Sequence, residues 1–311
     1  RPVRGPGGAS GRYGGGRGGP GEGRPRGRRR QAGGAGGGGR GMRVVDRASD
    51  LDDAFARASS EAKAAFGDGR LYAEAFLPRA RHVEVQVVGD GSGAVLHVWD
   101  RECSLQRQRQ KLVEIAPAIG VAPEIRTAML EAALTLARTA RYRGIGTFEF
   151  LVDATHDAAQ PFVFIEANPR IQVEHMVTKE VTGIDLVAVQ FALARGTPLA
   201  ELGLDGTMQR APEGFAMQVR INMETLDDQG QARPSGGAIG RYAMPTGRGV
   251  RVDDYGRSDY APSPRYDPLL AKLVVRAPAF ATAVAKARRA LAACTIEGPP
   301  APPGPRPNRR R

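Results

Sequence analysis

The sequence is poor in cysteine and has no long apolar run. Its 311 residues include only two cysteines, Cys103 and Cys294, which lie far apart and form no CxxC pair. This spacing gives no disulfide framework, which favours a reducing compartment such as the cytoplasm. No run approaches the roughly 18 apolar residues that a membrane span needs, and no apolar segment like that of a secretory signal opens the chain. We therefore expect a cytoplasmic protein without membrane association.

Acidic residues are nearly absent from both ends. The first 43 residues contain 11 arginines and one acid, Glu22, and the last 14 contain four arginines and no acid. Removing these from totals of 45 basic and 33 acidic residues leaves 30 basic and 32 acidic ones. The formal net charge of +12 therefore belongs to the ends, and it gives no evidence that the middle of the chain binds a polyanion.

Apolar residues are also scarce at the ends. Residues 1–32 are mostly glycine, arginine and proline, and residues 299–311 have a similar composition. Such segments cannot bury enough apolar surface to offset the entropy lost on ordering. We predict disordered tails at 1–32 and 299–311. An RGG-type nucleic-acid-binding segment is an alternative for the first tail, although Tyr13 is its one aromatic residue and no RGG triplet repeats regularly.

The chain between the tails has the periodicities of a folded protein. Apolar residues alternate over 83–87 and recur over 95–99, on either side of Asp90-Gly91-Ser92-Gly93, which predicts a β-hairpin. Apolar residues at helical spacing predict helices at 123–140, 186–193 and 280–293. Short apolar runs predict strands at 148–152, 162–165, 215–221 and 272–275. The mixture predicts an α+β fold.

One stretch alternates strictly between polar and apolar residues. Its polar members would share one face of an extended chain: Glu166, Asn168, Arg170, Gln172 and Glu174. An edge strand with a solvated face would give the same pattern. Glu149, which lies on a neighbouring apolar strand, favours a site instead, because an unpaired buried carboxylate is costly. Acids on adjacent strands with an amide nearby suit Mg²⁺, and the arginine suits an anion.

Eight stretches together resemble the biotin carboxylase family of the ATP-grasp superfamily. They run in the family's order from about residue 33 to 298: GGGGRGMRVV (36–45), RHVEVQVVGD (81–90), RECSLQRQRQKLVEIAPA (101–118), YRGIGTFEFLVD (142–153), FIEANPRIQVEHMVTKEVTGIDLV (164–187), RIN (220–222), RPSGG (233–237) and YDPLLAKL (266–273). Their variants look most like multidomain acyl-CoA or pyruvate carboxylases. The resemblance implies the latter part of an ATP-grasp domain at 33–198 and a biotin carboxylase C-terminal domain at 212–298.

The resemblance also implies site residues. The metal ligands, for Mg²⁺ or Mn²⁺, would be Glu149, Glu166 and Asn168. The bicarbonate pocket would be Arg170, Gln172, Val173 and Lys111. The catalytic residues would be Glu174, the base that deprotonates bicarbonate, together with Arg170, Lys111, and Arg220, which would stabilise a biotin enolate. The nucleotide contacts would be Gly36, Gly37, Gly38, Gly39, Glu74, His82, Gln106 and Arg109.

The implied reaction is the carboxylation of biotin with bicarbonate and ATP, through carboxyphosphate. Biotin would be a substrate carried on a separate biotin carboxyl carrier domain, and a carboxyltransferase would use the product. The resemblance implies a homodimer or larger oligomer for the intact enzyme. It leaves the final carboxyl acceptor open, with acetyl-CoA, propionyl-CoA and pyruvate as candidates. Carbamoyl phosphate synthetase, a sibling ATP-grasp ligase, is an alternative that does not share the Arg220 and RPSGG region.

The sequence departs from the family where the nucleotide would bind. Ala32 stands where the family has a phosphate-contacting lysine, eight residues before Arg40. Low-complexity sequence replaces the family's N-terminal subdomain, and family-like sequence stops within a motif at both ends. A catalytically inactive fragment, with tails translated out of frame from a GC-rich gene, is therefore the alternative to an active enzyme. Translating the other two reading frames tests this hypothesis, which fails if neither gives family-like sequence beyond the present ends.

Overall fold

The structure is a computed structural model that describes residues 29–33, 43–77, 79–107, 109–154, 161–204, 211–229, 232–263 and 265–298. The chain divides into two compact units, residues 1–76 (unit 1) and residues 77–311 (unit 2). The glycine loop with Gly36, Gly37, Gly38 and Gly39 and most of both predicted tails lie outside the described residues, so the predictions made for them stay predictions.

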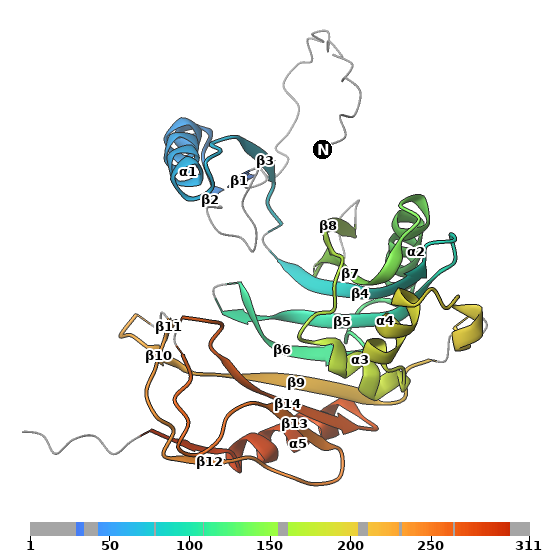
Figure 1. Ribbon diagram of the computed structural model, residues 1–311. Coiled ribbons are helices and arrows are strands. Elements are labelled where there is room, and N and C mark those ends of the chain that lie inside the picture. Colours follow the sequence, from blue (N-terminus) through green and yellow to red (C-terminus); the bar gives the residue numbers. More distant parts are fainter. Residues whose placement is uncertain are drawn as a thin grey trace, which may run out of the picture. The chain divides into compact units, whose positions relative to one another are not determined.

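A three-stranded antiparallel sheet and one α-helix form the described part of unit 1. The strands are β1 (Arg29–Gly33), β2 (Arg43–Val45) and β3 (Leu71–Ala75), with β1 in the middle (Figure 1). A short 3-10 helix, η1 (Ala48–Asp50), leads into α1 (Leu51–Phe66). Helix α1 buries Ala58 and Ala62 and ends at Gly67, whose φ of 76° is a left-handed conformation that glycine adopts without strain.

Strand β1 corrects one sequence prediction. The predicted disordered tail includes residues 29–32, but β1 pairs with β2 from Arg29 to Gln31 and with β3 from Arg29 to Gly33. The prediction is wrong for these residues because it weighed only the burial of apolar side chains. A strand between two others is held by main-chain hydrogen bonds on both edges, which do not require apolar residues.

Unit 2 is built on one eight-stranded sheet in which all neighbouring strands are antiparallel (Figure 1). The order is β13-β14-β9-β6-β5-β4-β7-β8. These strands are β4 (Ala80–Asp90), β5 (Val95–Arg107), β6 (Gln110–Ala116), β7 (Arg143–Asp153), β8 (Phe162–Asn168), β9 (Phe215–Asn222), β13 (Val250–Asp254) and β14 (Leu269–Ala277). Two small sheets pair β10 (Glu224–Leu226) with β11 (Ala232–Pro234) and β12 (Arg241–Ala243) with β15 (Thr295–Glu297).

The large sheet joins the two sequence regions predicted as separate domains. Strand β6 belongs to the predicted ATP-grasp region and β9 to the predicted C-terminal domain. The two strands pair from Val113–Val219 to Ala116–Ala216. One continuous sheet therefore carries side chains from both regions on the same face.

Helices cover both faces of this sheet. On one face, α2 (Pro123–Thr139) packs on β4 and β7 around Val85 and Phe150, and α5 (Phe280–Ala292) packs on β9 and β14 around Leu273. On the other face, α3 (His175–Thr182) packs on Val274, and α4 (Leu186–Ala194) packs on Val88. A 3-10 helix, η2 (Ala200–Leu202), follows α4. Because successive strand residues face opposite sides, every second strand side chain points toward the α3 side.

The sequence-predicted hairpin, helices and strands are present, and several strands are longer than predicted. The hairpin strands at 83–87 and 95–99 extend over β4 and β5, and the strand at 148–152 extends over β7. The helix predicted at 186–193 is α4, and those at 123–140 and 280–293 are α2 and α5. The α+β fold class is confirmed. None of the helices among the described residues is both long and apolar enough to span a membrane.

Strand β5 contains a bulge that changes which of its side chains face α3. Its partner register on β4 jumps from Val87–His97 to Val85–Asp100, so that β5 has two residues where β4 has one. Trp99, within the bulge, has a φ of 62°. Beyond the bulge Arg101 lies opposite Glu84, on the α3 side, whereas in a regular strand Asp100 would face that side.

Candidate active site

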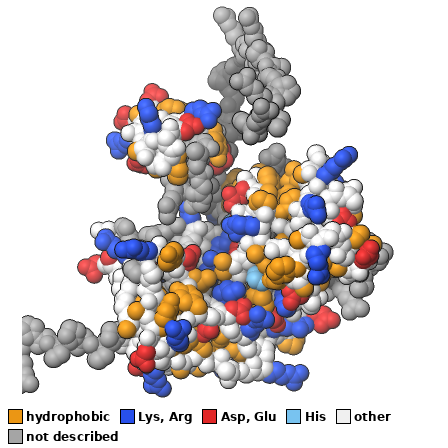
Figure 2. Space-filling model, viewed as in Figure 1, with side chains coloured by type: hydrophobic (Ala, Val, Ile, Leu, Met, Phe, Trp, Pro, Cys, Tyr) orange, Lys and Arg blue, Asp and Glu red, His pale blue; other side chains and the backbone are white. Residues whose placement is uncertain are grey.

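The α3 side of the large sheet carries buried charged and polar side chains. On β4, Glu84 and Gln86 alternate with buried valines and are themselves almost fully buried. Buried charges persist in proteins only when they are paired or hydrogen-bonded, so their partners define the site. The space-filling view shows Lys or Arg side chains and a histidine gathered near the middle of unit 2, among hydrophobic side chains (Figure 2).

Two carboxylates predicted as metal ligands lie opposite each other on adjacent strands. Glu149 of β7 and Glu166 of β8 are register partners. The amide nitrogen of Asn168 lies 2.9 Å from Glu149 Oε1 and 3.3 Å from Glu166 Oε1, so one small group reaches both acids. If the Asn168 amide rotates so that its Oδ1 faces the two acids, all three side chains offer oxygen ligands. Mg²⁺ and Mn²⁺ prefer oxygen ligands. The residues therefore fit a divalent cation.

The extended geometry predicted from Glu166 to Glu174 is only partly correct. Strand β8 ends at Asn168, and α3 begins at His175. The segment 169–174 between them is a loop, not a continued strand. Pro169 contributes to this ending, because proline has no N–H to give to a sheet. The prediction was wrong because strict alternation does not by itself distinguish a strand from a loop.

Two side chains of this stretch, Asn168 and Gln172, nevertheless contact Glu149. Gln172 donates from Nε2 to Glu149 Oε1 at 2.8 Å, and Gln172 and Glu174 are buried. Asn168 contacts the same carboxylate. Arg170 is more exposed, and its guanidinium donates to the carbonyl of Ile171 and, at 3.4 Å, to Asn168 Oδ1. The loop therefore brings together the groups that the alternation placed on one face.

Glu174, the predicted base, is held between two cations. Its Oε1 lies 2.7 Å from Lys111 Nζ, and its Oε2 lies 3.2 Å from Arg220 Nη2. It is 2% exposed. Lys111 comes from β6 and Arg220 from β9, the two strands that join the predicted domains. Lys111 and Arg220, both predicted as catalytic residues, therefore meet at Glu174 where β6 pairs with β9.

Lys111 is the positive centre of the carboxylate cluster. Its Nζ lies 2.5 Å from Glu84 Oε2 and 3.2 Å from Glu149 Oε1, besides its contact with Glu174. Burial alone would lower the pKa of Lys111, but the surrounding carboxylates, Glu84 foremost, outweigh burial and raise it. The ammonium is therefore charged throughout the neutral range.

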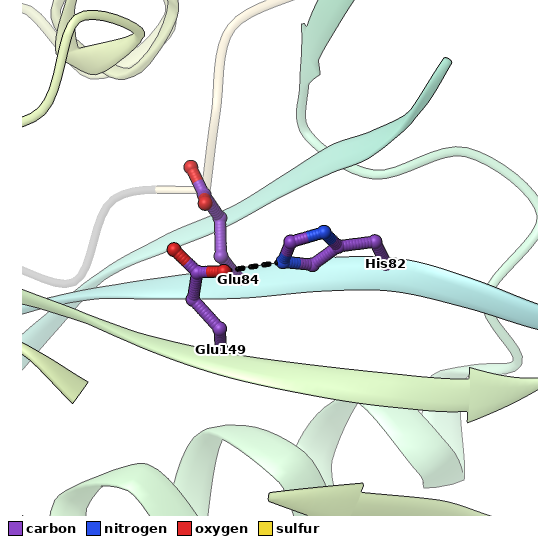
Figure 3. A group of neighbouring side chains, drawn as sticks. All are labelled: His82, Glu84 and Glu149. Carbon is purple, nitrogen blue, oxygen red and sulfur yellow. Dashed lines mark hydrogen bonds and ion pairs between the residues drawn. The ribbon is translucent and has the colours of Figure 1, made fainter. Parts of the chain in front are cut away.

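Two of the predicted nucleotide contacts lie beside the metal carboxylates. His82 Nε2 is 2.6 Å from Glu149 Oε2, and the other ring nitrogen is 2.7 Å from the Gln106 amide nitrogen. His82, Glu84 and Glu149 are close enough to hold an ion together (Figure 3). Lys111 Nζ already lies against both of these carboxylates, so an ammonium compensates the charge of this group.

The remaining predicted residues are more dispersed. The Val173 carbonyl accepts from Lys272 Nζ at 3.5 Å, close to the Glu174 pocket. Arg109 lies between β5 and β6 with a φ of 67°. Glu74 is an exposed residue of β3 in unit 1. The structure thus brings together the metal, bicarbonate and catalytic residues of unit 2.

Three buried residues of the site escaped sequence reasoning. Glu84 pairs with Lys111, Arg101 pairs with Glu84 at 2.5 Å, and Glu114 pairs with Arg220 at 2.6 Å. For Glu84 the signal was a charged residue between apolar ones within a predicted strand, in Val83-Glu84-Val85. Cys103 of β5 is fully buried, and burial raises the pKa of its thiol.

Comparison with known proteins places this constellation in one family. The model of the carbamoyl-phosphate synthase L chain ATP binding domain matches residues 31–202. The model of the biotin carboxylase C-terminal domain matches residues 218–302. The second match, which contains Arg220, separates the chain from other enzymes that share only the first domain. The chain belongs to the biotin carboxylase family.

Similar proteins include both free and multidomain carboxylases. Pyruvate carboxylase of Aspergillus niger is 46% identical over 263 residues, which cover 83% of this chain and 21% of that protein. A biotin carboxylase–ATP complex from Campylobacter jejuni is 42% identical, with a TM-score of 0.79. The match covers 87% of the present chain and 58% of the Campylobacter chain. The biotin carboxylase domain dimer of Hydrogenobacter thermophilus 2-oxoglutarate carboxylase, solved with MgADP, ADP and bicarbonate, is 38% identical with a TM-score of 0.78, over 87% and 58%. The chain thus spans one fifth to three fifths of the length of these relatives.

Proposed function

We propose that this chain carries the metal, bicarbonate and biotin side of a biotin carboxylase site, which carboxylates biotin with bicarbonate and ATP. The observation that carries the proposal is the position of Glu174, buried between Lys111 and Arg220 beside the carboxylates of β7 and β8. A base next to two cations suits a substrate that is an anion and becomes more negative on losing its proton. Relatives solved with ATP or with MgADP and bicarbonate support this choice of substrates.

In the first step, bicarbonate would bind between Arg170 and Gln172, and the backbone of Val173 would complete the pocket. The planar guanidinium of Arg170 can pair with two oxygens of the anion. Glu174 would accept the bicarbonate proton, and an anion oxygen would then form a bond to the γ-phosphorus of ATP as the bond to ADP breaks. The product is carboxyphosphate. Lys111 would stabilise the negative charge that gathers beside it.

A divalent cation would bind at Glu149, Glu166 and Asn168, the residues that fit it. Bound there, Mg²⁺ or Mn²⁺ would neutralise charge on the β- and γ-phosphates during transfer. Glu149 is suited to this role, because hydrogen bonding from His82 and the charge of Lys111 outweigh burial and lower its pKa to about 2. Glu149 is therefore ionised at neutral pH and needs no deprotonation before it binds a cation.

In the second step, carboxyphosphate would break into CO₂ and phosphate, and biotin would capture the CO₂. The phosphate released in this step would take the N1′ proton, which turns the ureido group into an enolate whose oxygen Arg220 would stabilise. The N1′ nitrogen then bonds to the carbon of CO₂. Biotin would arrive on a carrier domain, a carboxyltransferase would use the product, and the intact enzyme would be a homodimer or larger oligomer in the cytoplasm. Related carboxylases are named for pyruvate and for 2-oxoglutarate, so the acceptor stays open.

The nucleotide side of the site would draw on residues of β4 and β5 and on the glycine loop. His82 and Gln106 lie beside Glu149 and would contact the adenine or ribose, with Glu74, Arg109 and the glycine loop as further contacts. Ala32 supplies no positive charge where the family has a lysine. For the isolated chain we infer bicarbonate binding with weak use of ATP, close to the alternative of an inactive fragment.

The test is bicarbonate-dependent ATP hydrolysis with free biotin, measured for the wild-type chain and Glu174→Gln. Removing the base should lower the bicarbonate-dependent rate by roughly 10²- to 10⁴-fold, and MgATP binding, followed by calorimetry, should not change. A chain that binds bicarbonate but never hydrolyses ATP would favour the inactive fragment. Loss of MgATP binding in Glu174→Gln would contradict the role given to this residue.

A further inference from the structure

Arg101 lies at the centre of the α3 side of the sheet, and the proposed reaction gives it no role. It is fully buried. A guanidinium has five N–H groups, and each has an acceptor here: Glu84 Oε1 at 2.5 Å, Gln86 Oε1 at 2.8 Å, Thr178 Oγ1 at 2.9 Å, Thr147 Oγ1 at 3.0 Å and Gln172 Oε1 at 3.4 Å. The acceptors belong to β4, β7, α3 and the loop 169–174, which Arg101 therefore ties together.

The contact with Gln172 determines which way its amide faces. Because a guanidinium donates and cannot accept, the oxygen of Gln172 must face Arg101. The other end of the amide, Nε2, then donates to Glu149 Oε1 at 2.8 Å. Reversing the amide would set N–H against N–H at Arg101 and oxygen against oxygen at Glu149. Both neighbours therefore exclude the reversed amide.

We propose that Arg101 is a positioning residue for bicarbonate: by holding the oxygen of Gln172, it keeps Nε2 directed so that one N–H donates to Glu149 and the second N–H can donate to the anion. The inference rests on the proposed function, which assigns Gln172 to that pocket. An N–H donor stabilises an anion, whereas the amide oxygen would repel it. A lysine at this position has three N–H groups on one atom and cannot serve two strands, the loop and the helix together.

The bulge in β5 supplies a matched control. Asp100 precedes Arg101 and faces the opposite side of the sheet, where its Oδ2 accepts from Arg126 Nε of α2 at 2.8 Å. Arg126 is thus a half-buried, ion-paired arginine of α2 on the opposite side of the sheet, where its guanidinium donates to Asp100 and to the Ala118 carbonyl. Its replacement removes a similar interaction without touching Gln172.

The experiment compares the full chain with Arg101→Lys, Arg101→Met and Arg126→Met. The Gln172 side-chain NH₂ signal, identified in ¹⁵N NMR spectra by its loss in Gln172→Glu, reports the amide directly. Titration of ¹³C-bicarbonate reports the affinity of the pocket. Both Arg101 variants should shift or broaden the Gln172 signal and weaken bicarbonate by about tenfold or more, the effect of one lost charge-assisted contact. Arg126→Met should change neither.

The outcomes separate the positioning role from the proposed function. An unchanged Gln172 signal in the Arg101 variants, or an equal loss of bicarbonate affinity in Arg126→Met, would overturn the positioning role. A wild-type chain that binds no bicarbonate would overturn the proposed pocket, while the Gln172 signal would still report on Arg101. If Arg101→Met does not fold, Arg101→Lys decides the matter, because it keeps a positive charge beside Glu84.

Discussion

Glu114 is the residue at which burial and charge pairing oppose each other most directly. It is fully buried, and it accepts from Arg220 Nε at 2.6 Å and from Gln218 Nε2 at 3.0 Å. Burial raises its pKa to about 7, although Arg220 acts in the opposite direction. Because Arg220 also contacts Glu174, protonation of Glu114 would leave Glu174 as the main partner of that guanidinium.

The raised pKa predicts how stability changes with pH. Between the unfolded value of 4.5 and the folded value of about 7, the folded chain binds this proton and the unfolded chain does not. The contribution of Glu114 is therefore fully present below pH 4.5 and is lost as the pH rises through about 7, on the order of 3 kcal/mol in all. Urea unfolding of the wild type and Glu114→Gln from pH 5 to 8 checks this.

Comparing the unfolding of the wild type with that of Glu114→Gln separates the effect of Glu114 from the effects of other titrating groups. Burial lowers the pKa values of His97 and His175, and these groups are the same in both chains, so their effect cancels in the comparison. Glu149, with a pKa of about 2, stays ionised from pH 5 to 8. The wild type should lose stability relative to Glu114→Gln as the pH rises. Parallel curves for the two chains would show that Glu114 has no such proton.

Single residues of the site were predictable where the family motif contains them. Glu149, Glu166, Asn168, Gln172 and Glu174 were placed together from sequence, and they lie together. Their roles stay predictions. Arg101 and Glu114 were not found, because each is recognised only by a partner far along the chain: Arg101 by Thr147 and Thr178, and Glu114 by Arg220. No local pattern contains such pairs.

At the scale of elements, the loop 169–174 shows what periodicity can and cannot predict. The alternation correctly grouped the polar side chains, because Glu166, Asn168 and Gln172 lie beside Glu149. It failed on geometry, because β8 ends at Asn168 and the last polar residues reach the site from the loop and from the N-terminus of α3. The bulge at Trp99 was not predicted either, since the pattern of a strand does not report an extra residue on one strand of a pair.

Strand β1 carries the element-scale prediction. It is the middle strand of unit 1, and Ala32 pairs with Tyr72 near the end that leads to the glycine loop. The family's lysine at this position contacts phosphate, so Ala32→Lys should strengthen MgATP binding by about tenfold, as for one charge-assisted contact. Isothermal titration calorimetry measures it. Ala73→Lys, which adds the same charge at an exposed position of β3, should have little effect, and equal gains in both variants would indicate non-specific attraction.

At the scale of the whole molecule, most of the apolar core among the described residues belongs to unit 2. The four apolar clusters found there consist of residues between 83 and 290. A chain of residues 77–298 should therefore fold cooperatively by itself and bind bicarbonate as the full chain does. Trp99, the one tryptophan of the sequence, reports on the sheet by fluorescence. Its urea transition should coincide with that of far-UV circular dichroism, and separate transitions would contradict a single cooperative unit.

The pairing of β6 with β9 limits how this family can exchange parts during evolution. A recombination event between residues 202 and 218, the interval between the two family matches, looks harmless on a linear map. It would nevertheless pair the β6 of one parent with the β9 of another. A shift of one residue in the register between these strands would turn Arg220 away from Glu174. Viable chimaeras should therefore come from parents that preserve the pairing of Val113 with Val219, whatever their overall similarity.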